Sequence, residues 1–134
     1  MARDADPPVA ETGRGRYVIQ TNAQFAGLQK MDLAALAEAC PHDWFNQTLC
    51  LVNESVVRLG VFKGEFHWHK HDREDEYFYV ISGLLLVDLE GETVALGNGQ
   101  GMLVPRRVLH RTRAPERTAV LMVESASVTP TGDR

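Results

Sequence analysis

The sequence predicts an all-β domain, a sandwich or barrel of short strands. From residue 44 to residue 124, short segments rich in Val, Leu, Phe, Tyr and Thr follow one another. Turn signals containing Gly or Asn separate these segments at intervals of about ten residues. The 134 residues are enough for one domain with a single core and too few for a catalytic domain plus a regulatory one. Many short, evenly spaced strands are typical of a closed or two-layered β architecture.

The elements are expected in the following order. Residues 1–14 are expected to form a disordered or loosely held tail, followed by a single domain over 15–134. A short helix is expected over 31–40, because Asp32 can cap it, Ala and Leu follow at helical spacing, and Pro41 ends it. The expected strands are TLCLV, SVVRLGVF, EFHWH, EYFYVI, LLLVDL, TVAL, GMLVP, VLHRT and TAVLMVE. The turn signals between them are Asn53-Glu54, Lys63-Gly64, Ser82-Gly83, Glu90-Gly91 and Asn98-Gly99.

Composition and charge exclude several partner classes. The chain has 14 Lys and Arg against 18 Asp and Glu, a formal charge of −4, and no basic stripe, so we expect no nucleic-acid partner. Its longest strongly apolar run, residues 84–87, is far shorter than the roughly 20 residues of a spanning helix, so we expect no membrane partner. The N-terminus lacks the apolar run of a secretory signal, and Cys40 and Cys50 form no CxxC pair, so we expect a reducing, cytoplasmic location.

The histidines carry the main chemical signal. His67, His69 and His71 occupy alternate positions in FHWHKH, so in a strand they project from one face. Imidazoles at this spacing can meet one metal ion at roughly 2.0 to 2.2 Å. Glu76 opens the next strand and can complete the set if the turn at 72–75 resets the alternation, and His110 in a late strand offers a fourth ligand. The predicted metal ligands are His69, His71, Glu76 and His110.

The same residues have ordinary structural explanations that differ in weight. We interpret His42 as a hydrogen-bonded core or surface group, and the acidic run 72–75 as a solvated hairpin tip. Glu76 is different, because a carboxylate directed into a core is costly unless a cation or a donor meets it. Arg106 and Arg107 suggest an anionic ligand, although two arginines in a turn are more often solvated charge.

Two motifs resemble those of the cupin superfamily. The stretch His-x-His-x4-Glu-x6-Gly from His69 to Gly83 resembles the first motif, and Gly99-x5-Pro105-x4-His110 resembles the second. The resemblance implies a six-to-eight-stranded antiparallel jelly-roll barrel, or double-stranded β-helix, over roughly residues 44–125. It also implies one divalent transition metal ion, Fe, Mn, Ni, Zn or Cu, on the four ligands named above. The phrases WHKHDREDE and TPTGD are similar to those of small single-domain cupins labelled mannose-6-phosphate isomerase-like.

The sequence departs from the family pattern at three positions. Lys63 stands where the first motif begins with Gly, and Gly64 follows one place late. Arg107 stands in place of a Gly, so this turn must either avoid positive φ or accept strain. Ala114 replaces an Asn that often follows the histidine of the second motif. None of these positions is a ligand, so the departures concern the rim of the pocket.

The predicted function is that of an enzyme acting on a small oxygenated metabolite, by dioxygenase or isomerase-type chemistry. Four ligands on an ion that accepts six leave positions for a substrate, and His67 or Glu76 is available to move a proton. His67 could also replace His69 as a ligand, although we favour a pocket-lining role. The alternative is a non-catalytic metabolite- or metal-binding module, because fold and ligand set do not specify a reaction.

Quaternary structure follows from the alternation of the strand EYFYVI. Glu76, Phe78 and Val80 are expected to face the interior, which leaves Tyr77, Tyr79 and Ile81 on the opposite face. An apolar outer face must be covered by a second sheet, the N-terminal helix or another subunit, and a two-fold homodimer is the commonest outcome and the one we expect.

Overall fold

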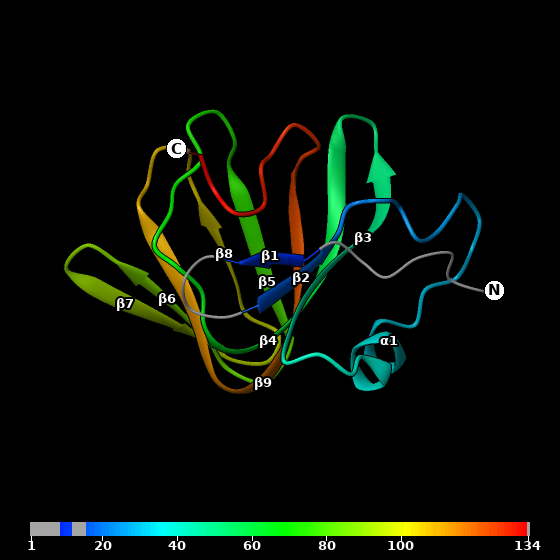
Figure 1. Ribbon diagram of the computed structural model, residues 1–134, viewed down its shortest axis with the longest axis horizontal. Helices are drawn as coiled ribbons and strands as arrows, with labels where there is room; N and C mark the ends of the chain where they lie inside the picture. The colour runs from blue at the N-terminus through cyan, green and yellow to red at the C-terminus, as the bar shows by residue number, and fades with distance from the viewer. Residues whose placement is uncertain (1–8, 12–15, 134) are drawn as a thin grey trace.

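Nine strands and one helix make up the part of the chain that this computed structural model describes, residues 9–11 and 16–133. The strands form a jelly roll with neighbours in the order β1-β2-β3-β4-β9-β5-β8, and a β6–β7 hairpin pairs with β9 (Figure 1). The predicted all-β class is confirmed. The strands are β1 (Val9–Glu11), β2 (Arg16–Gln20), β3 (Trp44–Val52), β4 (Ser55–Glu65), β5 (Glu76–Ser82), β6 (Leu85–Leu89), β7 (Glu92–Leu96), β8 (Gly101–Val104) and β9 (His110–Ser125).

Two N-terminal strands extend the expected barrel. β1 pairs antiparallel with β2, so its three residues differ from the loose tail expected for 1–14, while 1–8 and 12–15 lie outside the described residues. β2 pairs parallel with β3, which makes the sheet mixed rather than purely antiparallel. The parallel pairing is possible because the long segment 21–43, which contains the helix, supplies the crossover.

The region before β5 is the main departure from the expected strands. Lys63-Gly64 is not a turn, because Gly64, at φ 94°, lies at a bulge inside β4 where the register with β9 shifts. The segment EFHWH is not a strand either, since β4 ends at Glu65 and the chain then runs irregularly to β5. The segments VLHRT and TAVLMVE, expected to be separate, belong to the single long strand β9. The other four turn signals do connect consecutive strands.

The helix α1 (Leu33–Ala39) covers the outer face of the barrel. Its N-terminus is capped as expected, because the carboxylate of Asp32 accepts a hydrogen bond from the Ala35 N–H at 3.1 Å. Figure 1 shows α1 outside the barrel, and its buried Ala37 packs with Leu49, Leu59 and other apolar residues of the outer face. No helix among the described residues is long and apolar enough to cross a bilayer.

The barrel interior has an apolar part and a polar part. The apolar part is an aromatic cluster in which Tyr17, Trp44 and Phe66 have ring centroids 4.7 to 4.8 Å apart. On β5 the expected alternation is confirmed, since Glu76 and Phe78 are buried whereas Tyr77 is exposed. Strand parity therefore places the β5 carboxylate inside the barrel, where the polar part begins.

Candidate metal centre

The irregular segment 66–75 carries two of the predicted ligands and is held against β9 by its backbone. His69 and His110 exchange two backbone hydrogen bonds of 2.9 Å, forming an isolated antiparallel bridge. Further along, the Arg107 N–H donates to the His71 carbonyl at 2.7 Å. These contacts replace the strand expected for EFHWH, and they bring His69 directly opposite His110.

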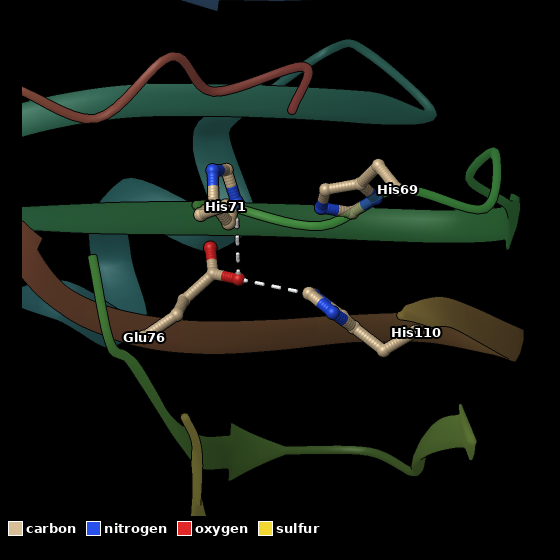
Figure 2. Close-up of side chains that lie close together, drawn as sticks. All are labelled: His69, His71, Glu76 and His110. Atoms are coloured by element: carbon tan, nitrogen blue, oxygen red, sulfur yellow. Dashed lines mark hydrogen bonds and ion pairs between the residues drawn. The ribbon is translucent and has the colours of Figure 1, made fainter. Parts of the chain in front are cut away.

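The four predicted ligands form one buried group. His69, His71, Glu76 and His110 each offer a ligand atom, and these atoms all lie within 4.8 Å of one another. Figure 2 shows the three imidazoles and the carboxylate directed toward a common point. Glu76 and His110 are the first residues of β5 and β9, so two strand starts and one connecting segment supply the group. The turn at 72–75 does reset the alternation, because the Glu76 side chain points inward.

Backbone carbonyls fix the orientation of two imidazoles. His69 Nδ1 lies 3.0 Å from the His67 carbonyl, and His110 Nδ1 lies 2.9 Å from the Val108 carbonyl. A carbonyl oxygen only accepts, so Nδ1 must carry the proton in both rings. In the neutral imidazole this leaves Nε2 with a bare lone pair, which is the arrangement by which outer groups prepare histidine for a metal.

The contacts of Glu76 require a cation. Its Oε1 lies 3.2 Å from His110 Nε2 and 3.6 Å from His71 Nε2. With the His110 proton on Nδ1, a lone pair faces a carboxylate oxygen, so either an additional proton or a metal ion must lie between them. Both ring nitrogens of His71 are buried without a hydrogen-bond partner among the described residues. The donor set therefore fits a divalent transition metal, which would satisfy all of these groups together.

The electrostatics agree with this fit. Burial, assisted by the nearby His110, lowers the pKa of His69 to about 4, so its ring is neutral near pH 7. Burial alone would raise the pKa of the Glu76 carboxyl, but the adjacent His110 and His71 rings outweigh burial and the net direction is downward. Glu76 is thus a carboxylate and His69 a neutral imidazole, the forms that bind metal.

The C-terminal segment covers the histidine segment, which gives the TPTGD phrase a structural role. His67 Nε2 donates to the Thr131 carbonyl at 2.6 Å, and the Asp133 N–H donates to the Lys70 carbonyl at 2.9 Å. Gly132 has a φ of 93°, and a Cβ at this position would lie 2.5 Å from the His69 Cβ. Only glycine allows this close approach.

The remaining predicted residues lie outside the group of four. His67 is tied to Thr131, and its Nδ1 is buried without a partner among the described residues. His42 stacks on Phe45 on the outer face of β3, at a centroid distance of 5.4 Å. Arg106 forms an exposed ion pair with Asp75. Arg107 does adopt the left-handed region expected of a glycine, with a φ of 69°.

Two buried charged residues beside the site were not singled out from the sequence. Glu124 of β9 is the register partner of Glu76, and Arg58 of β4 lies next to it, with 3.4 Å between Arg58 Nε and Glu124 Oε1. Burial, reinforced by the negative charge of Glu76, raises the pKa of Glu124 to about 9. A signal was present, because Arg58 and Glu124 are charges inside the otherwise apolar runs SVVRLGVF and TAVLMVE.

Comparison with known proteins agrees with the fold and the motifs. The family model described as Cupin domain (Cupin_2) matches residues 56–125, just over half of the chain. The Uncharacterized protein YdbB of Bacillus subtilis (strain 168) is 40% identical over 94 residues, 69% of this chain and 83% of that protein. Polyketide synthase CurC of Streptomyces cyaneus is 44% identical over 45 residues, which are 34% of this chain and only 29% of that protein.

A solved structure shows the same fold. The cupin-2 domain containing protein from Shewanella frigidimarina superposes with a TM-score of 0.68 at 24% sequence identity, covering 71% of this chain and 93% of that one. The jelly roll, the buried ligand group and the match over both motifs lead to one conclusion. This chain belongs to the cupin family, as a Cupin_2 domain protein.

Proposed function

We propose that this protein is a metal-dependent enzyme acting on a small oxygenated metabolite, by dioxygenase or isomerase-type chemistry. One observation carries the proposal: the buried group His69, His71, Glu76 and His110, in which a lone pair of His110 faces the carboxylate of Glu76. The three imidazoles and one carboxylate suit Fe, Mn, Ni, Zn or Cu in the divalent state. Such an ion, when bound, supplies Lewis-acid polarisation of a substrate oxygen or a place for dioxygen.

The residues of the chain have distinct roles in this proposal. His69 and His110 present Nε2, because their Nδ1 protons are held by backbone carbonyls. Glu76 contributes a carboxylate that can also accept a proton from a bound substrate. His67 donates through Nε2 to Thr131, so its Nδ1 has a free lone pair and can take up or release a proton beside the site.

The test is metal content together with turnover. Protein prepared without chelators or an affinity tag is analysed for metals, then assayed for oxygen consumption and for conversion of dicarbonyls, keto acids and sugar phosphates. We expect stoichiometric metal and turnover of at least one class of substrate. Iron would favour oxygen chemistry, whereas zinc would favour isomerisation. Metal content no higher than that of His110→Ala protein would contradict the proposal.

The alternative is a non-catalytic metabolite-binding module with the same site. It would be supported if metal-loaded protein turned over none of these compounds while one of them raised the melting temperature. His67→Gln sharpens the distinction. It should lower turnover without changing metal content if His67 moves a proton, and it should change neither quantity in a module that only binds.

We also propose that the protein is a cytoplasmic homodimer. Tyr77 and Tyr79 of β5 lie beside Leu103 of β8, and all three side chains are exposed on the outer face of the barrel. Cys40 and Cys50 are free thiols, which suits a reducing compartment.

The dimer is tested by light scattering at tens of micromolar, which should give twice the monomer mass. Tyr79→Glu should reduce the measured mass to the monomer value. A wild-type monomer would remove the dimer proposal.

A further inference from the structure

A row of polar side chains crosses the inner wall of the barrel, starting at the metal centre. Residues paired directly in antiparallel strands share a face, as do alternate residues of one strand. Glu76 pairs with Glu124, and Glu124 pairs with Val56, two positions from Arg58. Arg58 in turn pairs with Thr48 of β3. The row therefore runs over the four neighbouring strands β5, β9, β4 and β3, and all of its side chains face the same interior as the ligand Glu76.

This row contains most of the unsatisfied buried polar atoms in the described part of the chain. They are Asn46 Oδ1, Thr48 Oγ1, Arg58 Nε and Nη1, and Glu124 Oε2. The four residues are only 1 to 5% exposed. A buried polar group without a partner costs about 1 to 3 kcal/mol, so a cluster of them in one place requires an explanation. A polar ligand that enters the barrel supplies one.

The contact between Arg58 and Glu124 does not account for the unsatisfied atoms. The contact recorded between them, 3.4 Å from Nε to Oε1, does not have hydrogen-bond geometry, and Arg58 Nη1 and Glu124 Oε2 also have no hydrogen-bond partner among the described residues. An arginine that serves a carboxylate structurally is commonly bidentate, with distances near 2.7 to 2.9 Å. Arg58 thus has N–H groups directed into the interior that no described residue receives.

The charge of the interior also calls for an anion. A divalent metal ion and Arg58 carry three positive charges, and Glu76 and Glu124 carry at most two negative charges, so at least one net positive charge remains in a space shielded from water. An organic anion would offset this charge. The exposed rim pair Arg106–Asp75 is already neutral, so the anion suggested by the sequence is better placed inside the barrel than at the rim.

We propose that Arg58 binds the carboxylate of an organic acid whose second oxygen, of a hydroxyl, keto or second carboxyl group, lies at the metal centre. This inference rests on the proposed function and names its substrate class. Arg58 supplies N–H donors to the carboxylate, and Asn46 Oδ1 is an acceptor for a substrate hydroxyl. Thr48 Oγ1 can donate or accept, so the wall matches hydroxy acids and keto acids better than neutral sugars or dicarbonyls.

The test uses two diacids and their monoamides as probes on cobalt-substituted protein. Malonate and succinate are each titrated against malonamate and succinamate, and binding is followed by the visible spectrum of Co(II). The diacid and its monoamide both keep one carboxylate for the metal. The ratio of their affinities therefore measures the contribution of the second carboxylate. Azide, which is too short to reach beyond the metal, reports whether the metal and its open position are intact. Arg58→Met is the main variant, and Arg106→Met at the rim is its matched control.

We expect wild-type protein to prefer at least one diacid over its monoamide by about tenfold or more, in line with a charge-assisted bidentate contact. Arg58→Met should reduce this ratio to within about twofold of one, while azide affinity and cobalt content stay unchanged. Arg106→Met should leave the ratio as in wild type. If Arg58→Met does not fold, Arg58→Met/Glu124→Gln, which removes the buried guanidinium and the buried carboxyl together, takes its place.

Other outcomes separate the two proposals. A wild-type ratio near one for both pairs, or a preference that survives Arg58→Met or the double variant, would overturn the role of Arg58 while leaving the metal centre standing. Wild-type protein that retains no cobalt would overturn the proposed function and this inference with it. Loss of azide binding in Arg58→Met would show that Arg58 supports the metal centre rather than an organic acid, which also overturns the inference.

Discussion

Two buried arginine–carboxylate contacts on opposite faces of the barrel wall differ in how completely they are satisfied. Asp88 of β6 accepts hydrogen bonds from Thr93 Oγ1 at 2.7 Å, from Arg111 Nε at 3.0 Å, and from Arg113 Nε and Nη2 at 2.7 and 3.0 Å. Glu124 of β9 faces the interior, lies 3.4 Å from Arg58 Nε without hydrogen-bond geometry, and keeps Oε2 without a partner among the described residues. Both carboxylates are 4% exposed.

The difference shows which buried charges serve the fold and which are left available. The Asp88 cluster joins β6, β7 and β9, and its satisfied hydrogen bonds hold the hairpin on the barrel. Arg58 and Glu124 lie beside the candidate metal centre and keep unpaired atoms, which is costly for a structural pair and useful for a site that receives a ligand. We therefore expect variants of the interior group to change metal content, and variants of the Asp88 cluster to change the free energy of unfolding.

The largest effect is expected where the interior group itself is broken. His110→Ala removes one ligand and leaves Glu76 buried without its partner, so metal affinity should fall by about 100-fold or more, together with any activity. His42→Ala, which removes a ring stacked on the outer face, is the control and should retain metal. Elemental analysis after dialysis measures both. Equal metal loss in the two variants would mean that the site is misassigned.

The next effect is expected on the outer face. Asp88→Ala removes four hydrogen bonds and takes the carboxylate partner from Arg113, while Arg111 keeps its ion pair with Glu65. The free energy of unfolding should therefore fall by about 1 to 2 kcal/mol, less than for a dry site because both arginines are partly exposed. Metal content should not change. Urea unfolding followed by circular dichroism measures the stability. A loss of metal without a loss of stability would reverse the roles assigned to the two faces.

The interior pair should respond in the opposite direction. Arg58→Met/Glu124→Leu replaces two incompletely paired polar side chains by apolar ones, so the free energy of unfolding should stay equal or rise by about 1 kcal/mol. The same urea measurement applies. A fall of more than about 1 kcal/mol would show that the pair stabilises the fold after all, and the contrast with Asp88 would disappear.

The two faces also differ in how much the sequence could reveal. Alternation within EYFYVI was enough to set Glu76 and Tyr77 on opposite faces, because it follows from local strand geometry. His69 and His71 do lie together, although they were paired by alternation in a strand that this segment does not form. The strand expected for EFHWH was wrong, since that segment is ordered by His110, which lies 41 residues after His69 in the sequence. Long-range contacts of this kind are not written in local periodicity.

The positions of Arg58 and Glu124 also depend on long-range contacts that the sequence does not reveal. Each was visible as a charge in an apolar run, but which face it occupies depends on the register between β4, β9 and β5. The β4–β9 pairing also contains a bulge at Gly64, and β9 joins two expected strands, and neither feature could be located from the sequence. The grouping of His69, His71, Glu76 and His110 was therefore predictable, whereas the wall beside this group was not.

A smaller effect concerns pH. Hydrogen bonds from Arg113, with those from Thr93 and Arg111, outweigh burial and lower the pKa of Asp88 below its ordinary value of 3.8. A lowered pKa in the folded state means that Asp88 adds stability above the unfolded value and loses it as the pH falls. The stability gap between wild type and Asp88→Asn should be constant from pH 7 to about 5 and shrink below about 4. A gap that widened on acidification would contradict this assignment.

The smallest effect is expected for a third arginine–carboxylate pair, at the rim. Arg106 Nε lies 3.2 Å from Asp75 Oδ1, and its backbone N–H reaches the same oxygen at 2.9 Å, but both side chains are exposed. Water screens such a pair, and the two side chains lose rotamer freedom to form it, so Arg106→Met should leave the free energy of unfolding unchanged within the error of urea titration. The backbone hydrogen bond survives the substitution, which keeps the turn in place. If Arg106→Met destabilised the protein as much as Asp88→Ala, burial and the number of satisfied hydrogen bonds would not explain how these arginine–carboxylate pairs differ. The inference that Arg58 is free to bind a ligand would then lose its support.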